Sequence, residues 1–254
     1  MITLLPELPA YAWALLALAA VIVGFSKTAL PGINTVSIAI FAALMPARES
    51  TGALLILLIV GDIFAVWSYR KHASWPTILR LAPAVVGGMI LGAIFLGLAD
   101  DAWVRRVIGA ILMLVVLFTV WRRWISQRSA VPSSAASARA ASIGYGSLSG
   151  FTTMVANAGG PVMSMYFLAA KFPVKEFLGT AAWFFAIINI TKLPFSVGLG
   201  LIDGGSLLLD ALLIPGVIAG AFAGRWVAGR VPQKVFESAV LVVTVLGAIY
   251  LLVA

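Results

Sequence analysis

The sequence consists mainly of apolar runs, each about as long as a helix that crosses a membrane. Hydrophobic residues make up 62% of the 254 residues and charged residues only 10%, whereas a soluble domain is usually about half apolar and a quarter charged. A soluble fold of this size has too little interior to bury so much apolar surface. Several runs reach or approach ~18 residues, the length typical of a transmembrane helix. We therefore predict an all-α polytopic membrane protein that lies in a lipid bilayer.

The charges and the missing residue types exclude several other classes of protein. The net charge is +8, but the basic residues lie in short loops between apolar runs. This is the positive-inside pattern of membrane proteins, so we expect no nucleic-acid partner. Cysteine is absent and His72 is the single histidine, which argues against a metal cluster. No Gly-x-x-x-x-Gly-Lys-Ser/Thr motif is present. We expect no metal and no cofactor.

The N-terminal segment is expected to remain in the mature protein. Met1 to Gly24 is apolar and lacks the positively charged start of a signal peptide. The apolar run also continues past any plausible cleavage point. We interpret it as the first membrane segment.

Two apolar segments are interrupted by polar and helix-breaking residues. The first break is Gly24–Asn34 (GFSKTALPGIN), and the second is Gly150–Pro161 (GFTTMVANAGGP). Residues 11–44 would form one straight helix of roughly 50 Å, which is too long for a hydrocarbon core of ~30 Å. The first segment is therefore either a re-entrant hairpin of two short helices or a pair of short spans.

Six further spans and one polar stretch complete the predicted organisation. The stretch from 126 to 142 is rich in Ser, Ala and Arg and is predicted to be a linker between an N-terminal repeat (1–125) and a C-terminal repeat (143–254). The further spans are Leu54–Trp67, Leu81–Leu98, Val104–Trp121, Phe177–Gly198, Leu207–Val227 and Phe236–Val253.

The two halves share an ordered set of residues, which indicates an internal duplication. The correspondences run from the break through the following spans. They are Gly24-Phe25 with Gly150-Phe151, Glu49 and Gly52 with Glu176 and Gly179, Asp62 with Asn189, and Pro83, Gly88 and Gly92 with Pro215, Gly220 and Gly224.

The basic residues favour opposite orientations for the two halves. If each broken segment returns to its own side, twelve of the 17 basic residues lie on one face. If each segment crosses once, the loops divide seven against eight, with no bias. The positive-inside rule favours the first arrangement. It predicts two inverted repeats, each a broken or re-entrant helical segment plus three spans, with both termini outside.

The two breaks are predicted to face each other and bind a small anion. Helix N-termini at a break carry partial positive charge and free N–H groups. Glycines let the backbone approach a ligand closely, and hydroxyl and amide groups offer neutral hydrogen bonds. The alternative is a tight helix crossing with satisfied hydroxyls. The uncharged candidates are Ser26, Thr28, Gly32, Asn34, Thr152, Thr153, Asn157, Gly159, Gly160 and Asn189.

Three charged residues in the apolar segments complete the candidate site. Lys27 lies in the first break and either faces the anion or extends to the membrane interface. Lys192 shares a helix face with Asn189 and is either a second cation or an interfacial anchor. Asp62, the acid well inside a predicted span, is a candidate for proton coupling or a structural partner of either lysine.

The paired breaks resemble those of the TauE/SafE family of sulfite and organosulfonate transporters. The resemblance covers essentially the whole chain, although Pro31 stands where a more glycine-rich run is expected. It implies a secondary transporter for a small sulfur oxyanion or organosulfonate, multi-pass in the bacterial inner membrane and often directed outward. An anion channel, an uptake permease for another organic anion and a non-transporting scaffold subunit stay open. An enzyme is disfavoured, because no pair of acids, metal cluster or activated nucleophile is evident.

Overall fold

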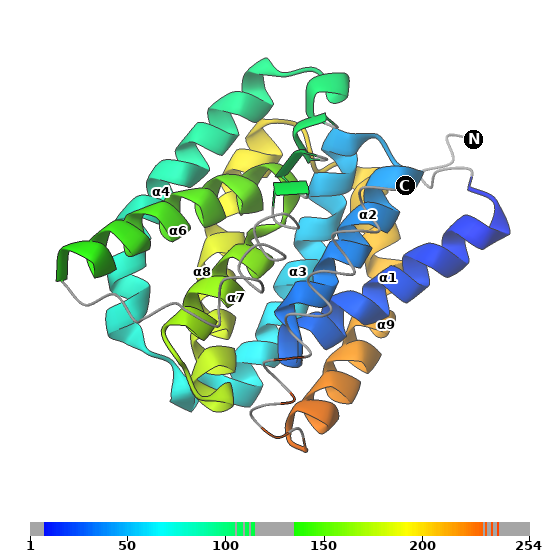
Figure 1. Cartoon of the computed structure of the whole chain (residues 1–254). Helices are drawn as coiled ribbons and strands as arrows, with labels where there is room; N and C mark the ends of the chain where they lie inside the picture. The colour runs from blue at the N-terminus through cyan, green and yellow to red at the C-terminus, as the bar shows by residue number, and fades with distance from the viewer. Residues whose placement is uncertain are drawn as a thin grey trace.

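Helices make up the fold of the described part of the chain (Figure 1). The computed structural model describes residues 8–104, 106–108, 110–111, 113–114, 135–230, 232, 235 and 238. Within these residues, 5 helices are long and apolar enough to cross a membrane. This confirms the predicted all-α polytopic membrane protein. The five are α1 (Ala10–Thr28), α3 (Ala47–Tyr69), α4 (Trp75–Leu98), α8 (Val174–Gly198) and α9 (Gly204–Ala228).

Both predicted breaks interrupt helices. A short 3₁₀ turn, η1 (Pro31–Ile33), separates α1 from α2 (Asn34–Leu44), and α6 (Ala135–Ala156) ends shortly before α7 (Gly159–Ala169). Pro31 has no N–H to continue a helix, and it begins the turn. Asn157 adopts a left-handed backbone with φ 54°, which asparagine tolerates better than most residues.

Each broken segment folds back on itself. The Ser37 hydroxyl of α2 donates to the Ala19 carbonyl of α1 over 3.0 Å. In the second segment, the Ser149 hydroxyl of α6 donates to the Gly159 carbonyl of α7 over 3.5 Å. Of the two forms that the sequence leaves open for residues 11–44, these contacts match the hairpin.

Some helices begin earlier than the apolar patterns indicate. Helix α3 starts directly after Pro46 and carries Glu49 in its first turn, where a negative charge is favourable. Helix α6 starts at Ala135, inside the predicted linker. The linker before that point lies outside the described residues. So do most of Val104–Trp121 and of Phe236–Val253, and these spans and the domain boundaries stay predictions.

The shared glycines mark two close helix crossings. Gly24 of α1 packs directly on the backbone of α9, and Gly220 of α9 packs on the backbone of α1. Gly150 of α6 and Gly88 of α4 make the equivalent pair of contacts. Because a Cβ at any of these positions would collide with a carbonyl oxygen, the crossings require glycine. The same crossing therefore occurs twice, with the two halves exchanged.

The equivalent helices α3 and α8 run antiparallel. Gly52, near the start of α3, packs on Leu201 just beyond the end of α8. Gly179, near the start of α8, packs on the backbone at His72 just beyond the end of α3. An antiparallel α3 and α8 is the arrangement that the predicted inversion requires, and the inverted repeats themselves stay a prediction. Their orientation across a bilayer stays a prediction.

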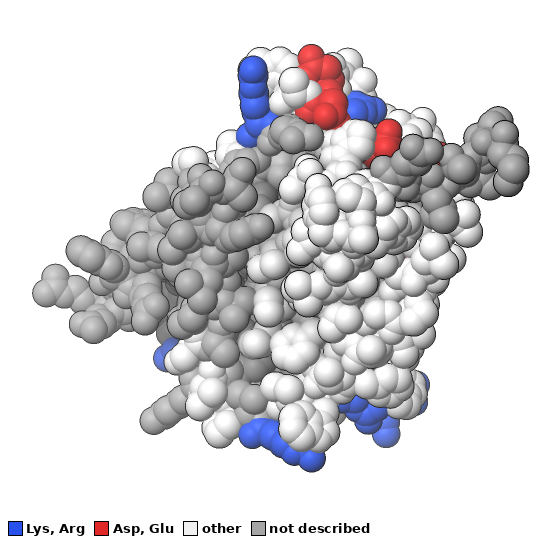
Figure 2. All heavy atoms as spheres, turned by 90° about the vertical axis from the view of Figure 1, so that its right-hand side faces the viewer, with Lys and Arg blue, Asp and Glu red and all other residues white. Residues whose placement is uncertain are grey.

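The charged side chains also differ between the two ends of the bundle. On the face drawn in Figure 2, acidic and basic side chains lie together at one end of the bundle. At the opposite end, the charged side chains drawn are all Lys or Arg. Glu49 begins α3, whereas Arg70, Lys71 and His72 follow its end. This asymmetry is the one that the positive-inside rule predicts for a single bilayer orientation.

Equivalent loops of the two halves should label from opposite sides of the membrane. Because the chain has no cysteine, single substitutions Lys71→Cys and Gly204→Cys give thiols without background, and both positions are exposed. A membrane-impermeant maleimide added to intact cells should label Gly204→Cys and should reach Lys71→Cys only after the membrane is opened. Labelling of both from the same side would contradict the inverted arrangement.

Candidate functional site

The two breaks are in contact, and a cavity lies beside their contact. A Cβ on Gly160 of α7 would lie 3.0 Å from the Pro31 carbonyl oxygen. The cavity beside this contact has a volume of about 30 Å³, more than the ~10–15 Å³ that one water needs. It is lined by Ser26, Lys27, Pro31, Asn34, Leu58, Thr153, Asn157, Gly160, Phe185 and Asn189.

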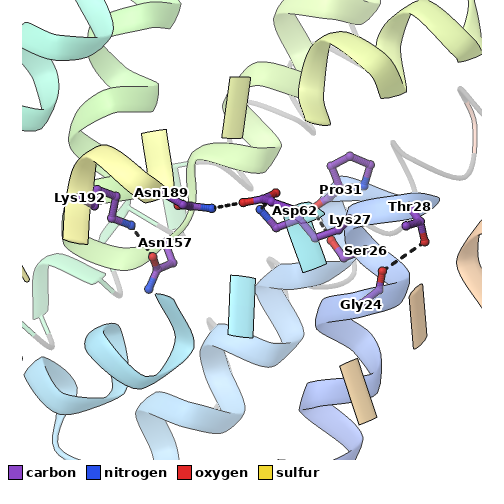
Figure 3. A network of polar contacts seen from close by, with 9 residues as sticks. All are labelled: Gly24, Ser26, Lys27, Thr28, Pro31, Asp62, Asn157, Asn189 and Lys192. Carbon is purple, nitrogen blue, oxygen red and sulfur yellow. Dashed lines mark hydrogen bonds and ion pairs between the residues drawn. The ribbon is translucent and has the colours of Figure 1, made fainter. Parts of the chain in front are cut away.

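A buried ion pair joins the first break to α3 (Figure 3). The Lys27 Nζ lies 2.6 Å from the Asp62 Oδ1, and the two side chains are only 10% and 2% exposed. The Lys27 ammonium also lies 5.0 Å from the centre of the Phe185 ring, within cation–π range. Lys27 therefore does not extend to an interface. Of the roles left open for Asp62, the one seen in this structure is that of a structural partner of Lys27.

A hydrogen bond between equivalent residues links the halves beside this pair. The Asn189 Nδ2 of α8 donates to the Asp62 Oδ2 over 2.6 Å. A carboxylate only accepts hydrogen bonds, so this contact fixes which end of the Asn189 amide faces Asp62. The Asp62 carboxylate thus binds one donor from each half of the chain, Lys27 and Asn189.

The second lysine is held at the second break. Lys192 is fully buried, and its ammonium donates to the Thr153 carbonyl over 2.6 Å and to the Asn157 Oδ1. The Asn157 Nδ2 in turn donates to the Thr51 carbonyl of α3 over 2.9 Å. In the described ranges no carboxylate forms an ion pair with Lys192. The interfacial-anchor interpretation of Lys192 does not fit its complete burial.

The buried charges around the cavity are unequal. When they are ionised, Lys27 and Lys192 bring two positive charges and Asp62 brings one negative charge. With all three ionised, the region has one excess positive charge. Such a charge in an apolar interior is costly unless an anion or oriented dipoles compensate it. Among the described residues, the Lys192 ammonium donates only to the Thr153 carbonyl and the Asn157 Oδ1.

Four predicted residues lie elsewhere. The Thr28 hydroxyl donates to the Ala221 carbonyl of α9 over 2.9 Å, so Thr28 belongs to a helix crossing. The Gly32 carbonyl accepts from the Thr35 hydroxyl over 3.0 Å. Gly159 packs on α6 through Thr153 and Ser149. Thr152 lines a separate apolar cavity of about 470 Å³.

Several buried residues that line the cavity or carry charge inside a helix were not predicted from the sequence. Leu58 and Phe185 line the cavity, but nothing in their sequence context distinguishes them from packing residues. Pro31 also lines it and lies in the predicted first break, but it was not among the predicted site residues. Asp210 in α9 is 1% exposed, and within the described residues neither carboxylate oxygen has a hydrogen-bond partner. Asp62 is therefore not the sole acid inside a span, and the position of Asp210 in the run 207–227 was a sufficient signal.

A comparison with protein families shows which family the chain belongs to. The family described as "Sulfite exporter TauE/SafE" matches residues 16–251, which include both breaks and both halves. The chain belongs to this family. Comparisons with curated proteins and with solved structures gave no match. Membership of TauE/SafE implies a multi-pass membrane transporter of sulfur-related anions, in a family of transporters and not of enzymes.

The Lys27–Asp62 pair should stabilise this TauE/SafE protein as a unit. Lys27→Met and Asp62→Leu each leave one charge buried without its partner, which we expect to lower the free energy of unfolding by about 3–5 kcal/mol. The double variant removes both charges and should lose much less than the sum. Thermal unfolding of the four proteins in detergent measures the coupling. Additive losses would contradict a direct pair.

Proposed function

We propose that the chain is a secondary transporter of a small, sulfite-like sulfur oxyanion or organosulfonate across the bacterial inner membrane. The supporting observation is that Lys27 lines a cavity between the two breaks, with Lys192 directly behind Asn157. Family membership supports the sulfur-related class of anion. The substrate itself is part of the proposal.

The backbone around the cavity adds further positive potential. Asn34 is the first residue of α2, and Gly160 is the second residue of α7. Both line the cavity, so two helix N-termini lie beside it. Because helix N-termini carry partial positive charge and unpaired N–H groups, they favour a bound anion. The two lysines and the two termini therefore act in the same sense.

A carrier fits the described state better than an open channel. Ser26, Asn157 and Asn189 line the cavity and are all buried. A channel requires a continuous aqueous path, whereas a carrier closes its site between exposures to the two sides. Inverted repeats with broken helices provide such alternating access in other transporters. We propose the same exchange for these two halves.

Asp62 supplies a route to proton coupling. In the described state its carboxylate is bound by the ammonium of Lys27 and by the amide N–H of Asn189. A substrate anion needs the same two donors, so it competes with Asp62. A proton on Asp62 removes the competing charge and releases both donors. The anion and one proton would then bind together and cross together.

Transport by the purified chain tests the proposal directly. Liposomes containing the protein should take up radiolabelled sulfite, and Lys192→Met should lower the initial rate by at least about tenfold, because one hydrogen-bonded cation in a low-dielectric site is worth more than ~1.4 kcal/mol. Lys175→Met, an exposed lysine in the same helix, is the matched control. Absence of uptake by the wild-type chain would favour a scaffold subunit. Equal rates for both variants would remove Lys192 from the site.

The pH dependence of transport tests the role of Asp62. Methanesulfonate keeps one negative charge near neutral pH, so its own protonation does not interfere. Its uptake at low concentration should rise as the pH falls, by up to about tenfold per pH unit for one linked proton. Asp62→Asn should abolish this slope, whereas Asp100→Asn, at an exposed position in the turn after α4, should retain it. A slope unchanged in Asp62→Asn would exclude Asp62 as the coupling group.

A further inference from the structure

One face of α9 packs into the seam between α1 and α3, and Asp210 lies on this face. Among the described helices, α9 has its main contacts with α1 and α3. Val217, about two turns after Asp210, packs against Gly24 of α1 and Gly61 of α3. Residues two turns apart share a helix face, so Asp210 occupies a packing position in the same seam, the α9 seam. The buried residues of α9 are Ser206, Leu209, Asp210, Leu213, Val217, Gly220, Ala221 and Gly224.

The carboxyl group of Asp210 has no polar partner in this seam. Asp210 is 1% exposed, and neither of its oxygens forms a hydrogen bond or an ion pair in the part of the chain that the structure describes. Leu209 and Leu213 on the same helix belong to a hydrophobic core. No titratable side chain of the three helices, all of which are described, bonds to Asp210. Those side chains are Tyr11 and Lys27 of α1, Arg48, Glu49, Asp62 and Tyr69 of α3, and Arg225 of α9.

The other half of the chain has an apolar residue at the equivalent position. Pro83 of α4 corresponds to Pro215 of α9, and the residues five positions before them are Ile78 and Asp210. Ile78 is buried as well, at 6% exposed. A helix crossing of this kind therefore forms without a carboxyl group, and packing does not explain Asp210. A buried polar group without a partner lowers stability, so the carboxyl group calls for another role.

The surroundings of Asp210 determine its protonation state. An ionised carboxylate among apolar helices is very costly unless a cation or several donors compensate it. Asp62 has such compensation, because Lys27 and Asn189 bind its two oxygens. Asp210 has none within the described residues, so the neutral acid is the form that fits the closed seam. Its ionisation requires water or a cation at the carboxylate, and either one requires α9 to move away from α1 and α3.

We propose that Asp210 is a proton-binding site that controls the α9 seam. The carboxyl group keeps its proton while the seam is closed, and loss of the proton above neutral pH opens the seam. Water enters from the start of α9, where the exposed Asp203 caps the helix, roughly 10 Å from Asp210 at 1.5 Å per residue. The inference does not depend on the proposed transport function. Because Asp210 keeps its proton at neutral pH, it adds nothing to the pH dependence assigned to Asp62.

Infrared spectroscopy in a detergent without ester groups tests whether Asp210 carries a proton. The C=O stretch of a carboxylic acid is separate from the bands of carboxylates and amides, and the chain has only 9 Asp and Glu residues. Near neutral pH the wild type should show an acid band, and Asp210→Asn should lose it. Asp203→Asn is the matched control and should retain the band, because Asp203 is exposed and asparagine also caps helices. No acid band in the wild type, or an acid band that persists in Asp210→Asn, would overturn the inference.

Thermal unfolding in detergent measures the linkage between the proton and the closed seam. Asp210→Leu places an aliphatic side chain in the seam, as Ile78 does in the other half. The wild type must keep a proton that its unfolded chain releases, so its stability should fall relative to Asp210→Leu as the pH rises. The equilibrium constant for unfolding should rise by up to about tenfold more per pH unit in the wild type. A difference between the two proteins that stays constant with pH would contradict proton binding by Asp210.

A thiol placed in the seam reports its opening. Leu213 is one turn from Asp210 and 4% exposed, and the chain has no cysteine, so Leu213→Cys gives a single buried thiol. Above neutral pH, a maleimide should label it more steeply with pH than it labels the double variant with Asp210→Asn, by up to about tenfold per pH unit. The double variant corrects for ionisation of the thiol itself. Equal pH dependence in the two proteins would contradict control of the seam by Asp210. If Asp210→Asn does not fold, judged by its elution in detergent, Asp210→Leu takes its place in each comparison.

Discussion

The buried pair of Lys27 and Asp62 is the interaction around which the two halves are joined. Neither charge can lie alone among apolar helices without a large desolvation cost, so the first break must lie against α3. The free oxygen of Asp62 accepts from Asn189, which brings α8 of the other half to the same point. Lys192, one turn further along α8, reaches the second break. Two polar clusters, one around Asp62 and one around Lys192, therefore tie the first and the second break to α3 and α8.

Close helix crossings allow these two clusters to form. The breaks meet only if α1 and α6 lie very near the helices that cover them, and Gly24 and Gly150 remove the side chains that would hold those helices apart. With little hydrophobic driving force between helices in lipid, packing of small residues supplies much of the association. The glycines and the site are thus parts of one design. The helix crossings determine where the two breaks lie, and the buried charges determine which side chains of the breaks contact α3 and α8.

The sequence predicts the breaks, the duplication and the membrane class, because each leaves a pattern along the chain. It does not predict which charges pair, because Asp62 is an equally plausible partner for Lys27 and for Lys192 until α3 and α8 are placed. Thr28 shows the same limit, since its hydroxyl is satisfied by a carbonyl of α9 far away in sequence. The start of α6 was missed for another reason. Its Ala- and Ser-rich segment is not apolar enough to stand out as part of a membrane helix.

The two halves differ in sequence at the breaks, but each break has a cation beside it. Lys27 in the first break aligns with Thr153 in the second, so the second half lacks this lysine. Lys192 reaches across from α8, however, and its ammonium binds the carbonyl of Thr153 itself. The equivalent position of each break is thus next to a positive charge, supplied by the break in one half and by a span in the other. The alternating access that we propose needs comparable attraction for the anion from both sides, and this arrangement provides a cation on each side without identical sequences.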